Sequence, residues 1–129
     1  MNKLTEELDV VLGVTPQDIG TADITGAYVA VGNYREILAT MVTASLTATK
    51  IAGISLLQAK DSSGTDAKEL KAVVSATAPT GDGAVIAEVG ASVSELDSGF
   101  THIAVKLTCD ETAKVGAATV ALGGKRYNS

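Results

Sequence analysis

The residues best suited to chemistry lie in the stretch DSSGTD at positions 61–66, between Lys60 and Lys68. Two aspartates, three hydroxyl side chains and a glycine within six residues offer oxygen ligands for a cation. A glycine-bearing loop beside lysines is also a candidate cradle for phosphate. The third possibility is that the stretch only reverses the chain, and the spacing of its residues distinguishes these roles.

The spacing argues against both ligand loops. A P-loop needs glycines at both ends of its arch and a Lys-Ser/Thr pair directly after the second, whereas this stretch has Gly64 alone. An EF-hand loop needs a glycine at its sixth place and a glutamate at its twelfth, and Gly64 is the fourth residue from Asp61. Asp, Ser and Gly also suit turns for backbone reasons. We therefore predict the tip of a β-hairpin, with a cation held by Asp61, Ser63 and Asp66 as the alternative.

The remaining reactive residues do not form a pattern typical of catalysis. His102 is the single histidine and sits opposite no cysteine, whereas zinc sites need about four ligands. No serine stands in a GxSxG elbow, and loop acids such as Glu95 and Asp110 have no aromatic or histidine partner to tune them. We expect no enzyme activity, no metal and no cofactor. The lone cysteine, Cys109, is expected to be a small hydrophobic residue of the core.

Composition argues against several classes of function. The 129 residues match one domain, and a net charge of −5 with scattered basic residues offers no footprint for direct binding of nucleic acid. Aromatic residues make up 3%, too few for the stacking platforms that bind sugars or single strands. No apolar run approaches the roughly 20 residues of a membrane span. The acidic N-terminus does not fit a secretory signal, so we expect synthesis in the cytoplasm.

Short β-like runs separated by Gly, Asp, Asn and Ser predict an all-β fold, an antiparallel, jelly-roll-like β-sandwich of about 7–8 strands. The expected strands cover residues 24–31, 35–44, 50–60, 68–78, 84–90, 100–109 and 116–124. In 100–109, alternation puts Ile103, Val105, Leu107 and Cys109 on a core face and His102 on the reverse. Strand 35–44 is apolar on both faces, so both are candidates for burial.

The first 23 residues are expected to form an N-terminal arm, with residues 24–129 as a single sandwich domain. The apolar positions of the arm, which fit one face of a short helix, are Leu4, Leu8, Val11 and Leu12. The segment LDVVLGV is equally compatible with an extended strand, and Gly13 and Pro16 are expected to stop either one. Such an arm packs on its own domain or on a neighbouring copy. Because the strands are rich in Ala and Thr, we also expect the fold to gain stability from assembly with neighbours.

Three stretches, LTEELDVVLGVTPQDI, QAKDSSGTDAKEL and ELDSGFTHIAVKLTCDE, together with the pair RY two residues before the last position, resemble a family of small tailed-bacteriophage virion proteins. The matching positions are the GVTPQ-like turn at 13–17, the hairpin residues Gln58, Ala59, Asp61, Gly64, Ala67, Lys68 and Leu70, the turn residues Asp97, Gly99 and Phe100, and the pair Arg126 and Tyr127. The resemblance implies a structural protein from the head region of the virion.

The first hypothesis from this resemblance is a capsid decoration (cement) protein. Such a protein would form a homo-oligomer, expected to be a trimer, on the outside of the head and would stabilise contacts of the major capsid protein, touching neither nucleic acid nor membrane. A head-to-tail joining or tail component is the alternative, and a host- or glycan-binding β-module is the third hypothesis. The candidate subunit or capsid contacts are Leu4, Leu8, Val11, Leu12, Asp61, Ser63, Asp66, Arg126 and Tyr127.

Overall fold

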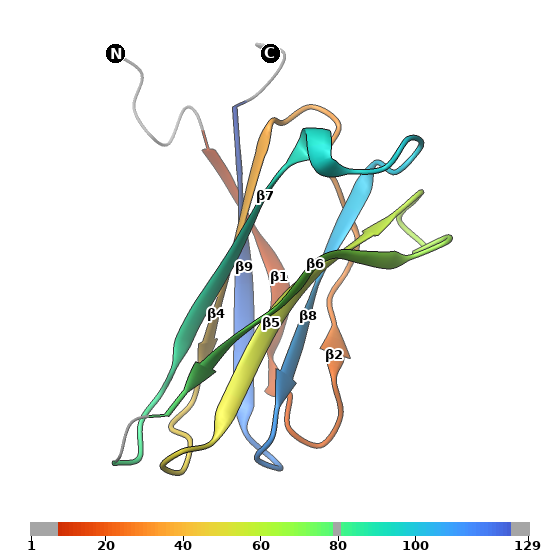
Figure 1. Cartoon of the computed structure of the whole chain (residues 1–129). Coiled ribbons are helices and arrows are strands. Elements are labelled where there is room, and N and C mark those ends of the chain that lie inside the picture. Colours follow the sequence, from red (N-terminus) through yellow and green to blue (C-terminus); the bar gives the residue numbers. More distant parts are fainter. Residues whose placement is uncertain (1–7, 79–80, 125–129) are drawn as a thin grey trace, which may run out of the picture.

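The computed structural model describes residues 8–78 and 81–124. Three of the expected contact residues, Leu4, Arg126 and Tyr127, lie outside these ranges. The described elements are β1 (Leu8–Asp18), β2 (Ile24–Thr25), β3 (Val29–Ala30), β4 (Glu36–Thr43), β5 (Ile51–Ala59), β6 (Lys68–Thr77), β7 (Ile86–Ser92), the short 3-10 helix η1 (Val93–Glu95), β8 (His102–Cys109) and β9 (Val115–Gly123), shown in Figure 1.

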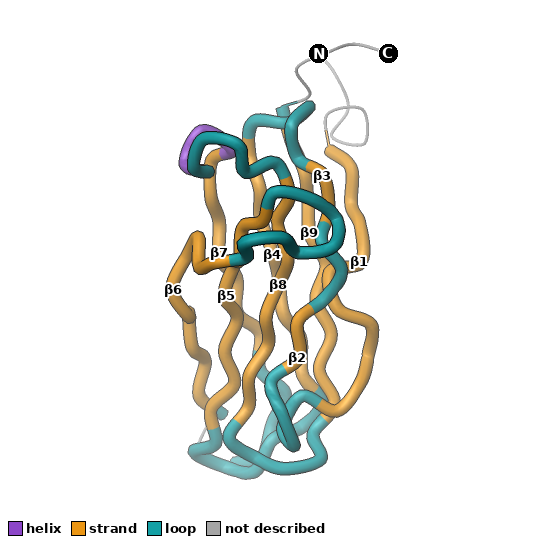
Figure 2. The backbone as a smooth tube through the Cα atoms, turned by 90° about the vertical axis from the view of Figure 1, so that its right-hand side faces the viewer, coloured by secondary structure: helices purple, strands orange, loops and turns teal. Residues whose placement is uncertain are grey.

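The strands form two antiparallel sheets that face each other. One sheet has four strands in the order β1-β9-β4-β7, and the other has the order β2-β8-β5-β6 with β3 also paired to β8. Figure 2 shows the two layers lying one behind the other. The predicted antiparallel β-sandwich is therefore confirmed. The expected strands agree with β4 to β9 to within two residues at each end, while 24–31 divides into β2 and β3.

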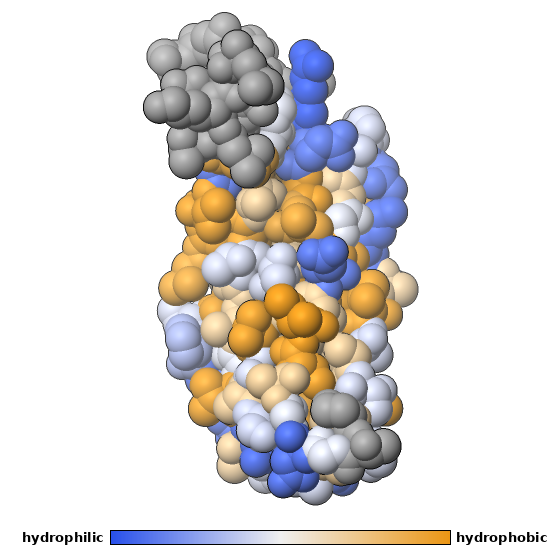
Figure 3. Space-filling model, turned by 90° about the vertical axis from the view of Figure 1, so that its left-hand side faces the viewer, coloured by the Kyte–Doolittle hydropathy of each residue, from blue (hydrophilic) through white to orange (hydrophobic). Residues whose placement is uncertain are grey.

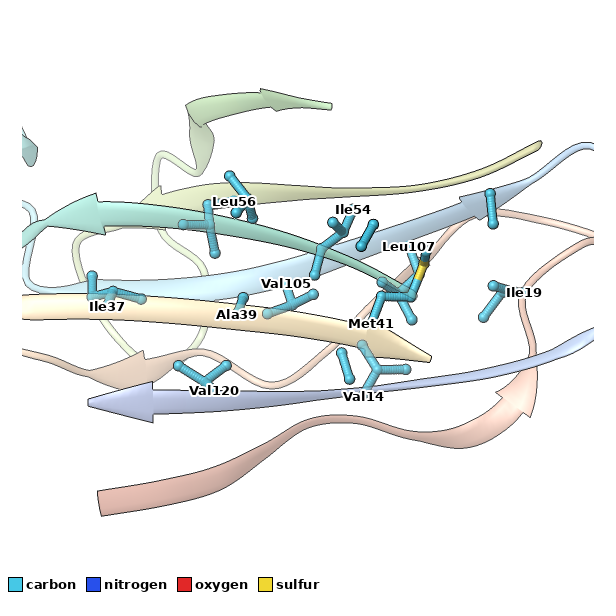
Figure 4. Close-up of a cluster of buried hydrophobic side chains, with 14 of the residues drawn as sticks. Val14, Ile19, Ile37, Ala39, Met41, Ile54, Leu56, Val105, Leu107 and Val120 are labelled. Carbon is cyan, nitrogen blue, oxygen red and sulfur yellow. The ribbon is translucent and has the colours of Figure 1, made fainter. Parts of the chain in front are cut away.

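The core lies between the two sheets and is built from one alternating face of each strand. From the four-stranded sheet, Ile37, Ala39 and Met41 point inward, and Ile54 and Leu56 do so from β5 (Figure 4). The predicted core face of β8 is confirmed, because its inward residues Ile103, Val105 and Leu107 are fully buried. Cys109 is partly buried and packs against this cluster. Period-2 alternation was sufficient to assign these faces.

Residues 8–18 of the expected arm form β1, which pairs with β9 from Leu8↔Gly123 to Asp18↔Val115. The sandwich therefore begins before the expected domain boundary at residue 24, and the extended alternative holds for this segment. The predicted stop at Gly13 and Pro16 is wrong. β1 is an edge strand that pairs with β9 alone. Because β1 has no second neighbouring strand, the missing N–H of Pro16 breaks no hydrogen bond on that side. Register shifts after Leu12 and Val14 absorb the GVTPQ segment as bulges within the strand.

Candidate interaction surfaces

The DSSGTD stretch is the tip of the β5–β6 hairpin, as predicted from its spacing. The carboxylate of Asp61 accepts hydrogen bonds from the backbone N–H of Ser63 at 2.9 Å and of Thr65 at 3.1 Å, and from the Thr65 hydroxyl at 2.6 Å. The Thr65 hydroxyl and the backbone amides lower the pKa of Asp61. The carboxylate that resembled a ligand for a cation therefore organises its own loop.

The tip also packs against a neighbouring loop. Gly64 has a φ of +81°, and a Cβ atom there would lie 2.8 Å from Cε2 of Tyr28. Both the left-handed backbone and the close approach of the Tyr28 ring favour glycine at this position. The second left-handed residue of the tip is Asp66, with a φ of +55° and an ion pair to Lys60 at 2.9 Å. The tip is thus held by the Tyr28 ring at Gly64 and by the ion pair between Lys60 and Asp66.

The base of the hairpin is braced by the turn at residues 97–100, the other internal stretch of the resemblance. Two lysines lie over the ring of Phe100, with Nζ of Lys60 at 5.7 Å and Nζ of Lys68 at 4.7 Å from its centroid. Lys68 forms an ion pair with Asp97, whose backbone N–H donates to Oε1 of the buried Gln58 at 2.8 Å. The two stretches therefore lie in contact, and the lysines of the hairpin bind the phenylalanine and the aspartate of the turn.

We expect Asp61→Asn to lower the melting temperature at neutral pH, because the amide cannot accept all three hydrogen bonds as a carboxylate does. The folded pKa of Asp61 lies below its unfolded value near 3.8. The stabilisation is therefore complete above that value and is lost as the pH falls through the lower folded pKa. Melting curves of both proteins across this range should converge in acid.

Ser63→Ala is the matched control, since no hydrogen bond from the Ser63 side chain is found within residues 8–78 and 81–124. This variant should melt like the wild type at every pH. An Asp61→Asn protein with unchanged melting at neutral pH would show that the carboxylate does not organise the tip.

Other acidic side chains also bind loops rather than gathering at a site. Glu111 accepts a hydrogen bond from the backbone N–H of Thr47 at 2.7 Å, and Asp18 accepts one from Gly20 at 2.9 Å. Hydrogen bonds from Thr47 and from Thr21, respectively, lower the pKa values of these two carboxylates. In the part of the chain that the structure describes, no three His, Cys, Asp or Glu residues could share a metal ion, and no helix is long and apolar enough to cross a membrane.

The second candidate surface is the outer side of the four-stranded sheet. Only its residues on β1 were among the expected contacts. Six of the nine large hydrophobic residues that are exposed in the described chain lie here, and Figure 3 shows orange patches across this side. They are Val10 (66% exposed), Leu12 (54%), Leu38 (41%), Val42 (50%), Ile86 (65%) and Val115 (44%). We call these residues, with the small side chains between them, the outer apolar face.

The ladder register sets five of the six large hydrophobic residues of the outer apolar face in three rows that cross the sheet, with Val115 beyond the third row. The rows are Val10, Ala121, Leu38 and Gly90; then Leu12, Thr119, Thr40 and Glu88; then Ala117, Val42 and Ile86. Small residues fill the middle of the sheet, and Glu88 is the one charged residue of these rows. Glu88 lies on β7, an edge strand, so its carboxylate stands at the rim of the face.

The outside of the five-stranded sheet is different, because the chain itself covers part of it. Ser55, Ala59 and Ala104 point to this side and are each at most 3% exposed. Figure 2 shows the β5–β6 loop lying in front of this sheet. The loop closes on Tyr28, which precedes β3. The chain's own loop thus covers part of one outer side of the sandwich around β8 and the end of β5, while β6 stays exposed on that side.

The expected contact residues fall on two separate surfaces. Leu8 and Leu12 lie on the outer side of β1, while Val11 points inward and packs against the core. The exposed residues Asp61, Ser63 and Asp66 lie together on the hairpin tip, over the other sheet. The helical spacing assumed for the arm missed Val10, the most exposed of the large hydrophobic residues. Strand alternation from Leu8 would have placed Val10 beside Leu12.

No protein-family model and no curated protein sequence matches this chain. Among solved structures, the SPBc2 prophage-derived protein YomS is similar with a TM-score of 0.54 and 12% identity, over 91% of this chain and 94% of that one. A chain of infectious bursal disease virus, Gx strain, has a TM-score of 0.54 at 12% identity over 95% of this chain. This chain spans only 33% of that viral chain.

A third similar structure belongs to an enzyme. It is the CBM22-1 and GH10 modules of xylanase 10B from Clostridium thermocellum, complexed with xylohexaose, with a TM-score of 0.51 and 12% identity over 95% of this chain and 30% of that one. At such identities the likeness shows a shared β-sandwich fold. The fold is found in a prophage-derived protein, in virus particles and in a xylanase.

Proposed function

We propose that the chain is a structural protein of a tailed-bacteriophage virion, acting as a decoration protein that binds the outside of the head and stabilises contacts of the major capsid protein. The observation that carries the proposal is the convergence of the two internal stretches of the resemblance. The hairpin tip at 61–66 and the turn at 97–100 form one braced projection. The fold shared with a prophage-derived protein over almost the whole of both chains supports it.

The braced projection suits a contact with a large assembly. Asp61 is held by three hydrogen bonds, so the exposed side chains of Ser63 and Asp66 stand on a backbone with little freedom left to lose. Each tip contact would be small and polar. On a particle with many identical sites, oligomeric copies would bind through several such contacts at once, and the affinity would rise through effective concentration. Net negative charge keeps free copies soluble.

Copy number on purified particles tests this proposal. A decoration protein follows the symmetry of the capsid lattice, so quantitative mass spectrometry against the major capsid protein should find hundreds of copies per virion. Particle preparations stripped of loosely bound protein by a salt wash provide the control. About a dozen copies or fewer would contradict decoration and support the alternative of a head-to-tail joining or tail component.

A glycan-binding module is the second candidate, because the xylanase structure bears CBM22-1 and is complexed with xylohexaose. The described chain holds three aromatic residues, and the rings of two of them already have contacts. Tyr28 lies against Gly64, two lysines lie over the ring of Phe100, and the Tyr34 hydroxyl donates to Asp9. Because sugar platforms need free flat rings, these contacts favour the virion proposal. A glycan array with specific hits would reverse that preference.

A further inference from the structure

We propose that the outer apolar face binds the same face of a second copy, so that two sandwiches stack through their four-stranded sheets. This inference does not rest on the role in a virion. Six exposed hydrophobic side chains on one sheet leave a large apolar area in water, and burying such area is the main driving force of association. On the other sheet, the β5–β6 loop lies in front of part of the outer side, and three large hydrophobic residues, Ile51, Val73 and Val74, are exposed on β5 and β6.

The chemistry of the face selects its partner. Among the residues of its three rows there is no basic side chain and a single carboxylate, Glu88, at the rim, and Glu36 stands in the adjoining row of Leu8, Gly123, Glu36 and Ser92. A strongly charged partner would therefore lose solvation without gaining ion pairs. The partner must be flat and apolar, and the chain itself provides such a surface. Across a two-fold axis each face meets an identical one, which is the commonest arrangement of homo-oligomers.

The shape of the face also suits stacking of sheets. The middle strand β9 contributes Ala117, Thr119 and Ala121, whose small side chains permit close approach. The larger Val10 and Leu12 on β1, with Leu38 and Val42 on β4, stand on either side of β9. Two sheets that meet in this way pack about 10 Å apart, as they do inside a β-sandwich.

The available area matches a weak but specific pair. Four strands spaced by about 4.8 Å, each rising about 3.4 Å per residue over roughly eight residues, give a face of about 500 Å². Two faces together bury about 1,000 Å², which is close to the lower limit for specific protein interfaces. The pair should therefore dissociate on dilution. The two-fold pair also differs from the trimer expected under the decoration-protein hypothesis, so the measured stoichiometry decides between dimer and trimer.

Sedimentation velocity over a concentration series tests the inference, using the full chain alone. The wild type should shift from monomer to dimer as concentration rises. Val42→Lys should weaken the dimer at least tenfold, because the ammonium group would lose its hydration between two largely apolar faces. Val73→Lys is the matched control, since Val73 on β6 is 48% exposed, close to the 50% of Val42, but belongs to the other sheet. This control should dimerise like the wild type.

Thr119→Arg is a second variant of the outer apolar face, which tests the inference if Val42→Lys fails to fold. Thr119 is exposed in the middle of the face, so arginine fits the monomer yet holds two sheets apart. It should melt like the wild type and remain monomeric. A wild type that stays monomeric at millimolar concentration would overturn the inference. A loss of capsid binding by Val42→Lys would not rescue it, because capsid binding tests the proposed function and not the dimer. Trimers, or dimers lost in Val73→Lys and kept in the other two variants, would overturn it as well.

Discussion

Ile103→Asp should unfold the sandwich at room temperature. Ile103 is fully buried on the inner face of β8, where it pairs with Val29 of β3 and Gln58 of β5. A carboxylate there must remain charged without a partner or take up a proton, and either way the hydrophobic contacts of the isoleucine are lost. We expect a loss of about 4 kcal/mol or more in the free energy of unfolding, which is most of the stability of a small domain. Circular dichroism without denaturant, compared with urea denaturation of the wild type, measures it.

The adjacent residue provides the control. His102 is half-exposed on the outer side of β8, and its Nδ1 lies 2.9 Å from the Thr101 hydroxyl. His102→Ala should therefore cost less than about 1 kcal/mol. The two positions are neighbours in one strand, so a difference between their effects on stability reports the direction in which each side chain points. Similar losses of stability in both variants would show that the facing of β8 is wrong.

Gly26→Ala should destabilise the fold strongly although it adds a single methyl group. A Cβ atom at this position would lie 1.7 Å from the carbonyl oxygen of Gly13, which is backbone and cannot rotate away. The N–H of Gly26 also donates to the carbonyl of Val105 at 2.8 Å. Gly26 therefore joins β1 of one sheet to β8 of the other, and the methyl group must push them apart. We expect a loss of about 3 kcal/mol in thermal or urea denaturation.

Gly32→Ala is the control for this prediction. No heavy atom lies within 4 Å of a Cβ atom built there, and Gly32 is exposed. The same substitution should change the free energy of unfolding by no more than about 0.5 kcal/mol. If Gly26→Ala were as stable as Gly32→Ala, the close crossing of β1 by the segment before β3 would not exist in solution.

Local patterns in the sequence were enough to predict most of the strands and the hairpin. Alternation in β8 identified Ile103, Val105 and Leu107 as core residues before any partner strand was known, because side chains of a strand point to opposite faces in turn. The spacing around Gly64 predicted a turn for a similar reason, since the residues that bend a backbone act within a few positions of one another.

The same local reasoning failed at β1, where the outcome depends on distant partners. Pro16 and Gly13 predict a break, yet the strand continues because β9 pairs with it on one side only and two bulges absorb the irregular residues. Nothing near Pro16 in the sequence shows that this strand is an edge. The sequence indicated an extended segment as one of two alternatives, and only the pairing decided between them.

By itself, then, the sequence determined the fold class, the positions of strands β4 to β9 and the hairpin tip, because each follows from the periodicity or turn chemistry of a short segment. The tertiary structure decided which apolar faces are covered. Leu38 and Val42 alternate as regularly as Ile37 and Met41, and no local rule separates the two sets. The two sets differ because the second sheet packs against only one side of β4, where Ile37 and Met41 lie. Leu38 and Val42 lie on the other side of β4, which stays exposed as part of the outer apolar face.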